Sequence, residues 1–437
     1  MNTQRIKTVY SFKGGILNSV SLFKYRYKEE SMCKKLFIIL TAVLFFTACA
    51  SQEQLAETTS AAETQNAEKA EQTFSAHITD SENLLNGAQI TVLEDFALCY
   101  AKTLTYMQPS EISHLFADSS SEECHINKTA YKTLCKIRSM QDKDLSLEYA
   151  KVTYNIISAY ESGNGVTVEL AEDNVQKFKH LNDKSCTYNT YHIFKLVHTG
   201  DRWKIKSHTQ EEDFFLLAAE AWNDAKGADC SERADNALQL LVDDAKENFV
   251  LAKENLNEFK KAEISKEYNR DEAVEYAKEW CSKRNSDYLE YDLYGGNCQN
   301  FASQCIHAGG MDMDIKGNHT CQWKFYGKNL NFNQSASGRS YSWIGVDEFY
   351  SYAVYNHTSG LAVQHDISLE YAQKGDIIQV GAYGQWRHSL VVTDVLKGEN
   401  GEVEDVVLAS NTADRWNYPL SAYIYTYPRL IHIDGQI

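Results

Sequence analysis

The sequence has fewer basic than acidic residues. Lys and Arg together number 43 against 60 Asp and Glu, and the formal net charge is −17 at pH 7. A chain with this balance is repelled by nucleic acid and by the headgroups of anionic lipids. We therefore expect no nucleic-acid partner, and a substrate surface that is neutral or cationic rather than polyanionic.

The usual spacings of metal ligands are also missing. The chain has no HExxH motif and no paired CxxC motif, and the isolated His319 and Cys321 have no second pair of ligands beside them. We therefore expect no metal and no other cofactor. Internal repeats are absent as well, which argues against a solenoid or a propeller.

Long apolar runs are nearly absent. The clearest is at residues 36–46, which follow two lysines and precede Cys49; this run is too short for a permanent membrane span and is typical of an export signal. The arrangement resembles a bacterial lipoprotein signal, which implies lipidation of Cys49 and a place on the outer face of the cytoplasmic membrane. A plain secretory signal or an uncleaved anchor are alternatives. We expect residues 1–48 to be the signal region. Its first 31 residues fit no part of a signal, so we expect translation to start at Met32; the alternative is an unusually long basic region before the apolar run.

The segment after the signal, residues 49–86, has few aromatic or aliphatic side chains and is dominated by Ala, Glu, Gln, Ser and Thr. This composition cannot form a packed core, so we predict a disordered tether. A tether of this length would hold the folded part on the order of 30 Å from the membrane.

Cysteine is plentiful, with eleven residues. Disulfides are possible in an exported chain, but their pairing cannot be deduced from spacing alone. Cys124 and Cys135 are a candidate for a local bridge.

Two folded regions are expected after the tether. In the first, residues 87–228, an amphipathic helix precedes four strand-like runs, and Asn164-Gly165 is a strong hairpin signal. The order suggests a small cone-like α+β domain, which loosely resembles nuclear-transport-factor-like folds; its role stays open. Residues 231–265 carry an apolar seam at helical spacing and are predicted to form a linking helix.

The most informative segment is residues 295–305. Two glycines and an asparagine suit a tight turn, and Cys298 opens an apolar stripe at helical spacing. We predict a helix that begins near Cys298, whose unpaired N–H groups favour a thiolate over a thiol. The alternative is that Cys298 is the first buried residue of the stripe and is inert.

A histidine far downstream supports the first interpretation. His388 lies near the start of a predicted strand, where it could meet a cysteine carried by a helix packed on the same sheet. A third group would hold the imidazole in one tautomer. Asn411, at the end of the next predicted strand, is the candidate, and Asp376 and Asp394 are its rivals.

An ordered set of segments resembles the bacterial putative amidase domain family, which comprises papain-like proteins akin to the NlpC and CHAP cysteine peptidases. The resemblance covers residues 266–437, roughly 40 % of the chain, and an ordered set is far more specific than a lone Cys or His. The segments that carry it are residues 268–277, residues 295–310, Trp323, Ser342-Trp343, residues 375–379, His388-Ser389 and residues 411–415.

The resemblance implies an α+β, papain-like cysteine hydrolase domain in which a helix bearing Cys packs on an antiparallel sheet bearing His. It implies Cys298 as nucleophile, His388 as base and Asn411 as the orienting residue. The thiolate would attack an amide carbonyl, and the oxyanion would meet the backbone N–H of Cys298 and the side chain of Asn297 or Gln299.

The expected function is extracytoplasmic hydrolysis of amide or peptide bonds, with peptidoglycan-type peptides as the substrate that the enzyme would face. Acyl transfer through the same thioester is a second possibility. A third is a non-catalytic surface lipoprotein whose papain-like module binds wall peptide or a protein partner. The oligomeric state is not predicted.

Overall fold

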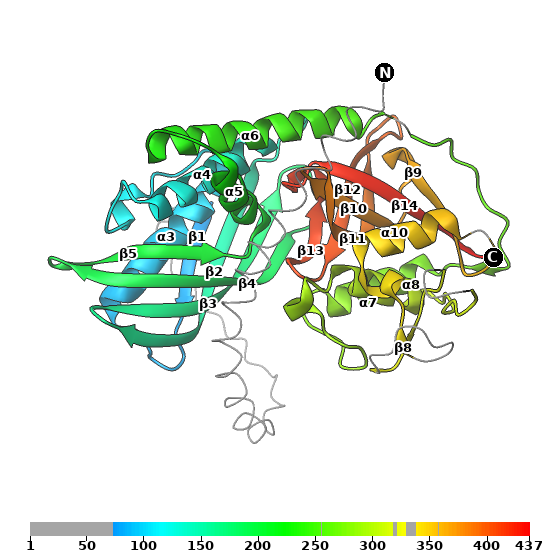
Figure 1. Ribbon diagram of the computed structural model, residues 1–437, viewed down its shortest axis with the longest axis horizontal. Coiled ribbons are helices and arrows are strands. Elements are labelled where there is room, and N and C mark those ends of the chain that lie inside the picture. The colour runs from blue at the N-terminus through cyan, green and yellow to red at the C-terminus, as the bar shows by residue number, and fades with distance from the viewer. Residues whose placement is uncertain (1–72, 255, 318–320, 329–337, 357) are drawn as a thin grey trace, which may run out of the picture. The chain divides into compact units, whose positions relative to one another are not determined.

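Twelve strands form one mixed sheet in the computed structural model, which describes residues 73–437 apart from 255, 318–320, 329–337 and 357 (Figure 1). The predicted export signal, Met32, Cys49, His319 and most of the predicted tether lie outside the described residues. The strands of this sheet are β1 (Phe74–Thr79), β2 (Leu147–Ser162), β3 (Gly165–Phe178), β4 (Ser185–Thr199), β5 (Arg202–Gln210), β6 (Lys266–Glu267), β9 (Leu361–Ile367), β10 (Ile377–Ala382), β11 (Gln385–Lys397), β12 (Val403–Ser410), β13 (Asp414–Pro419) and β14 (Tyr427–Gln436).

Helices cover both faces of this sheet, and a small separate ribbon pairs β7 (Phe325–Tyr326) with β8 (Gly338–Arg339). The α-helices are α3 (Gly87–Tyr106), α4 (Glu122–Arg138), α5 (Asp213–Asp224), α6 (Cys230–Leu251), α7 (Arg270–Trp280), α8 (Cys298–Ala308), α9 (Tyr341–Ile344) and α10 (Val346–Tyr355). Short 3₁₀ turns are η2 (Ser113–Leu115), η3 (Asp292–Tyr294), η4 (Leu369–Tyr371) and η5 (Leu420–Ala422).

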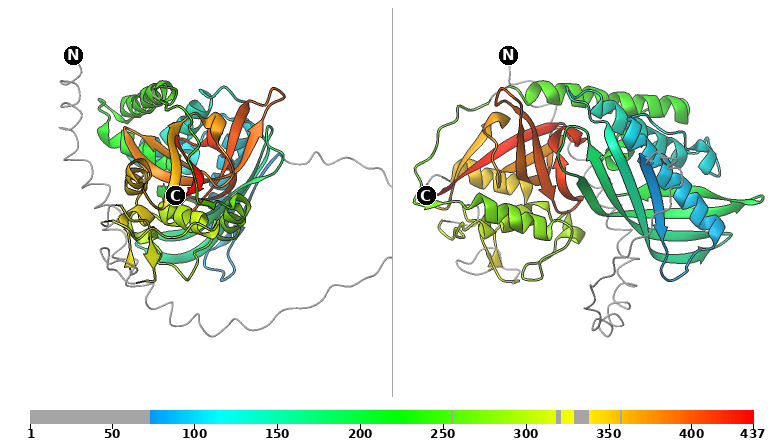
Figure 2. Two further views of the ribbon diagram at one scale, coloured as in Figure 1. Left: turned by 90° about the vertical axis from the view of Figure 1, so that its right-hand side faces the viewer. Right: turned by 180° about the vertical axis from the view of Figure 1, so that it is seen from behind.

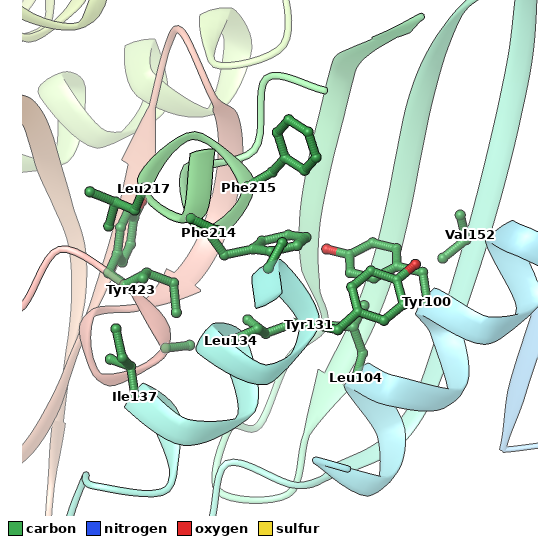
Figure 3. Packing of buried hydrophobic residues seen from close by; sticks show 14 of the residues in the cluster. Tyr100, Leu104, Tyr131, Leu134, Ile137, Val152, Phe214, Phe215, Leu217 and Tyr423 are labelled. Atoms are coloured by element: carbon green, nitrogen blue, oxygen red, sulfur yellow. The ribbon is translucent and has the colours of Figure 1, made fainter. Parts of the chain in front are cut away.

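The N-terminal part has the predicted helix and the predicted hairpins. Helix α3 begins after Asn86, whose side chain accepts from the N–H of Gln89 at 3.1 Å while Gln89 bonds back to the N–H of Asn86 at 2.9 Å, a reciprocal cap. Strands β2 and β3 pair antiparallel across a turn in which Gly163 has φ +64°. Helix α3 packs against β1, β2 and β5 and helix α4 contacts β5, and the rings of Tyr100 and Tyr131 meet between the two helices with centroids 5.9 Å apart (Figure 3).

Two boundaries differ from the sequence-based expectation. The range predicted as a tether contains β1, which pairs parallel with β2, so its residues Phe74–Thr79 are an ordered part of the sheet. The alternation of apolar and polar residues in this short strand is too brief to be recognised without its partner. Helix α6 ends at Leu251, well before the predicted limit of residue 265.

The C-terminal strands follow the order β13-β12-β11-β10-β14, all antiparallel. Helices α7 and α8 pack together against one face, through a cluster that includes Phe301, Val391 and Ala409. The opposite face, which carries Leu390 and Val392, belongs to the core that continues into the N-terminal part. Helix α6 spans the junction and contacts α4, α5, β10 and β14 (Figure 2).

The sequence predicts two folded regions, and a strand pairing joins them. Strand β13 pairs antiparallel with β4, with Asp414 opposite Tyr188 and Trp416 opposite Cys186. The sheet therefore continues from the N-terminal strands into the C-terminal ones, and one hydrophobic cluster includes residues of both regions.

Among the described residues, none of the helices has both the length and the apolar content that crossing a membrane requires. The nine cysteines in this part of the chain form no disulfide. The candidate bridge between Cys124 and Cys135 is wrong: both residues lie on α4, where eleven residues span roughly 16 Å, too far for a disulfide.

Candidate active site

Helix α8 begins at Cys298, as predicted. The turn before it needs glycine, because Gly295 and Gly296 have φ +112° and +125°, values that other residues rarely adopt. A Cβ built on Gly296 would also come within 3.5 Å of the Thr412 side chain. The turn thus places the nucleophile candidate against the chain that follows β12.

The side chain of Asn297 holds this turn. Its Nδ2 donates to Oδ1 of Asn411 at 2.6 Å, and its own Oδ1 accepts from the N–H of Tyr291 at 3.2 Å and from Nδ2 of Asn300 at 2.8 Å. Its backbone N–H donates to Oγ1 of Thr412 at 2.7 Å. The prediction that the side chain of Asn297 binds an oxyanion is therefore not supported, because its polar atoms are engaged in positioning Cys298.

Asn411 is part of the same support and does not hydrogen-bond to His388. Its Nδ2 donates to the carbonyls that end α7, those of Trp280 at 3.0 Å, Cys281 at 3.0 Å and Lys283 at 3.3 Å. Its Oδ1 accepts from Asn297. The structure therefore gives Asn411 a role in joining α7 to the nucleophile turn, and not the predicted role of orienting the imidazole.

The rivals of Asn411 are engaged elsewhere too. Asp376 accepts from Arg270 and pairs with His432, each at 2.7 Å. Asp394 forms an ion pair with Lys374 at 3.9 Å. Within the described residues, no hydrogen bond joins any of the three predicted orienting residues to His388.

Gln299 faces the sheet and is fully buried. Its Oε1 accepts from Oγ of Ser389 at 2.7 Å, and its Nε2 donates to Oγ of Ser303 at 3.2 Å. Nε2 of Gln379, from β10, donates to the same Ser389 hydroxyl at 3.1 Å. These bonds attach the first turn of α8 to β10 and β11, so the Gln299 side chain is a structural link rather than an oxyanion donor.

Backbone N–H groups lie near the sulfur of Cys298 on two sides. Those of Gln299 and of Cys298 itself come from the helix, and that of Ser389 comes from β11. All three lower the pKa of the thiol, but burial is the larger effect and leaves that pKa above its ordinary value. The predicted effect of the helix N–H groups on the thiol pKa is therefore present, but burial outweighs it.

His388 adjoins the sulfur through its backbone, because the Ser389 N–H belongs to the peptide bond that follows His388. Its side chain takes another direction. Residues opposite each other in an antiparallel ladder share a face, and His388 is opposite Val380 while Ser389 is opposite Gln379. The imidazole thus leaves the sheet on the face of Val380 and Leu390, whereas Ser389 faces α8.

The imidazole of His388 is buried, and its Nε2 has no hydrogen-bond partner among the described residues. Burial, helped by the positive charge of Arg415, lowers its pKa to about 3, so it is neutral at pH 7. Cys298 and His388 are therefore adjacent but not hydrogen-bonded, and neither carries a charge.

A half-buried ion pair that sequence reasoning did not find lies beside His388. A β-bulge places Arg387 between the paired residues Trp386 and His388, and Arg387 binds Glu220 of α5 through two bonds of 2.8 and 2.9 Å. The partner of Arg387 comes from a helix far away in the chain, and no spacing in the sequence indicates the pair.

The burial of His388 predicts a loss of stability in acid. Its pKa is about 3 in the folded protein and near 6.5 when unfolded. Below pH 6.5 the unfolded chain therefore binds a proton that the folded protein does not, and the free energy of unfolding decreases as the pH falls toward 3. At pH 5 the cost is about 2 kcal/mol. We expect the free energy of unfolding, measured by urea denaturation, to fall between pH 7.5 and pH 5 by about 2 kcal/mol less in His388→Leu than in the parent.

The control for this experiment is His198→Leu, at an exposed hairpin position. It should change with pH as the parent does. An identical pH response of His388→Leu and the parent would show that the imidazole is accessible to protons in the folded protein.

Comparison with known proteins agrees with the site's place in the chain. Residues 267–433 match the family described as the putative amidase domain, which supports the amidase-domain family for this region and suggests amide-bond hydrolysis. The uncharacterized protein YhbB of Bacillus subtilis (strain 168) is 32% identical over 134 residues, which are 30% of this chain and 39% of that protein. The chain thus covers about two-fifths of the length of this curated relative. No solved structure matches.

Proposed function

We propose that this chain is a cysteine hydrolase of the papain-like type that cleaves amide bonds in cell-wall peptides outside the cytoplasm. The observation that carries the proposal is the place of the Cys298 sulfur, at the start of α8 and against the amide of Ser389, one residue from His388. The match of residues 267–433 to an amidase-type domain supports the class of reaction.

The neutral state of both groups determines how the reaction would start. As the sulfur of Cys298 attacks the amide carbonyl, the imidazole of His388 takes the thiol proton. The S–C bond forms, the C–N bond breaks, and the same proton passes to the leaving amine. Water then hydrolyses the thioester. Because the imidazole leaves the sheet on the other face, this proton transfer requires the first residues of β11 to rearrange when substrate binds.

The backbone N–H groups around the sulfur fit the charge that develops on the carbonyl oxygen. Those of Cys298 and Gln299 are at the amino end of a helix, where partial positive charge favours an anion. They replace the side chains of Asn297 and Gln299 as the candidate oxyanion donors.

The extracytoplasmic location and the anchor remain proposals. They rest on the sequence of residues 36–49, which lie outside the described residues. A lipid on Cys49 would keep this acidic chain at the membrane, to which its charge does not attract it.

A second candidate is a binding module without catalysis. The observation that favours it is the missing hydrogen bond between the thiol and an imidazole that faces away, with Nε2 buried and unpartnered. Such a module would bind wall peptide or a protein partner through the same strand ends.

Trapping of the acyl-enzyme tests the proposal. We expect that incubation of the protein with muropeptides, followed by an acid quench, gives a mass increase equal to an acyl group on the peptide that contains Cys298. Parallel incubation with casein shows whether the protein also cleaves ordinary peptide bonds, and the product masses identify the bond that breaks.

The exposed Cys321 is the internal control for non-specific acylation. An adduct confined to Cys298 supports the hydrolase. Unchanged muropeptides, with no adduct at either cysteine, favour the binding module.

A further inference from the structure

The inner face of the N-terminal sheet carries a row of buried polar side chains across four neighbouring strands. Tyr154 of β2 is opposite Glu172 of β3, and His192 of β4 is opposite Gln210 of β5. Glu172 and His192 connect the two pairs, with 3.5 Å between Oε2 and Nε2. All four residues are more than nine-tenths buried. A polar row is unusual on a face that packs against helices.

The hydrogen bonds behind the row determine the tautomer of His192. Asn127 uses its Nδ2 as a donor to the Glu123 carbonyl at 2.9 Å, so its Oδ1 is the acceptor for Nδ1–H of His208 at 2.6 Å. Nε2 of His208 then accepts from Nδ1–H of His192 at 3.0 Å. Both imidazoles are neutral, because burial lowers their pKa, that of His192 to about 3. Nε2 of His192 is therefore an acceptor that points at Glu172.

Most of the unpartnered atoms around the row are acceptors. Neither Glu172 oxygen is in hydrogen-bond geometry with a donor, although the amide of Asn174 is near enough to lower its pKa in part. On β2, β3, β4 and β5 the atoms without a partner among the described residues include both Glu172 oxygens, Oδ1 and Nδ2 of Asn174, Oε1 of Gln176, Oε1 of Gln210, Nε2 of His192 and the Tyr154 hydroxyl. The hydroxyl of Tyr131 on α4, near Glu172, is also without one. Native proteins rarely leave such a group of buried polar atoms unsatisfied.

We propose that this row binds the protonated amine of a small organic cation, with Glu172 as its counter-ion and Gln210, His192 and Tyr154 as hydrogen-bond acceptors. An ammonium supplies several N–H donors and one positive charge, which suits a site of clustered acceptors around one carboxyl group. A metal ion suits it less well, because the described residues contain no group of three or more His, Cys, Asp or Glu side chains placed to hold one.

The surroundings of Glu172 suit a cation as well. Burial and then the charge of Glu212 raise its pKa well above the ordinary value. The phenols of Tyr100 on α3, Tyr131 on α4 and Tyr154 on β2 are also near enough for the charge of Glu172 to raise their pKa. A bound ammonium would offset both the burial cost and the repulsion by Glu212.

Thermal unfolding of the full chain with three chloride salts tests the proposal. Methylammonium has charge and N–H donors, tetramethylammonium has charge without donors, and potassium is a bare cation. We expect methylammonium alone to raise Tm, on the order of 5 °C at one hundred times its Kd. Glu172→Gln should abolish this rise, whereas Glu169→Gln, at a partly exposed position on the same strand, should keep it.

Tyr154→Phe provides a second variant, which removes one hydroxyl and should weaken methylammonium binding several-fold without abolishing it. Equal effects of the three salts on the parent, or a rise that persists in Glu172→Gln, would overturn the proposal and assign the polar atoms to bound water. The readout, Tm, does not depend on amide hydrolysis, so this proposal is tested separately from the proposed enzyme activity.

Discussion

Cys298→Ala is expected to lower the rate of amide hydrolysis by at least about 10³-fold, because the thioester route has no other nucleophile in the site. The measurement is the release of peptide products from muropeptides under single-turnover conditions. His388→Ala should cost about 10²- to 10³-fold, since it removes a general base and leaves the thiol in place.

Cys305→Ala is the matched control for this prediction. Both cysteines belong to α8 and both are buried, but Cys305 packs in the helix–sheet core. Its loss should reduce stability and leave the turnover of folded protein within a few-fold of the parent. Full activity of Cys298→Ala would remove Cys298 from the mechanism, and equal losses in both variants would point to a fault in folding.

Arg415→Met is expected to destabilise the protein by about 3–5 kcal/mol, because it leaves two carboxylates buried without their partner. Arg415 of β13 bonds Glu212 at 2.7 Å and Asp213 at 3.0 Å, and its guanidinium lies 4.6 Å from the ring centroid of Tyr423. Glu212 directly precedes α5 and Asp213 is its first residue. The ion pairs therefore connect β13 to α5. Urea denaturation followed by circular dichroism gives the value.

Arg202→Met is the control for the loss of an arginine as such. Arg202 is exposed, and its ion pair with Asp201 at 4.0 Å should contribute little. Addition of Glu212→Gln and Asp213→Asn to Arg415→Met should recover part of the lost stability, because it removes the two buried carboxylates that Arg415→Met leaves unpaired. A change of less than 1 kcal/mol in Arg415→Met would mean that water reaches these carboxylates in the folded protein.

Local rules were sufficient for the elements of the site. The start of α8 at Cys298 follows from two glycines with positive φ and an apolar stripe behind them. The β2–β3 hairpin follows from its Gly-Asn-Gly turn, and β11 from its run of β-branched residues. Each of these depends on interactions within a few residues of the chain, which the sequence displays directly.

The direction of the side chains required the tertiary structure. Whether His388 faces α8 or the opposite core depends on the register of β10 and β11 and on the bulge at Arg387, and a shift of one residue reverses the face. Asn411 was assigned to His388 by order along the chain, whereas the end of α7 supplies three carbonyls that its amide satisfies.

The sequence by itself determined the acidic surface, the helix that presents Cys298 and the strands that follow it, because composition, turn chemistry and periodicity are local properties. The pairing of β4 with β13, the carboxylates that bind Arg387 and Arg415, and the pKa shifts of Cys298 and His388 were decided only by the tertiary structure. Their physical reason is shared: each depends on burial and on partners that lie far away in the chain, and neither quantity exists before the chain has folded.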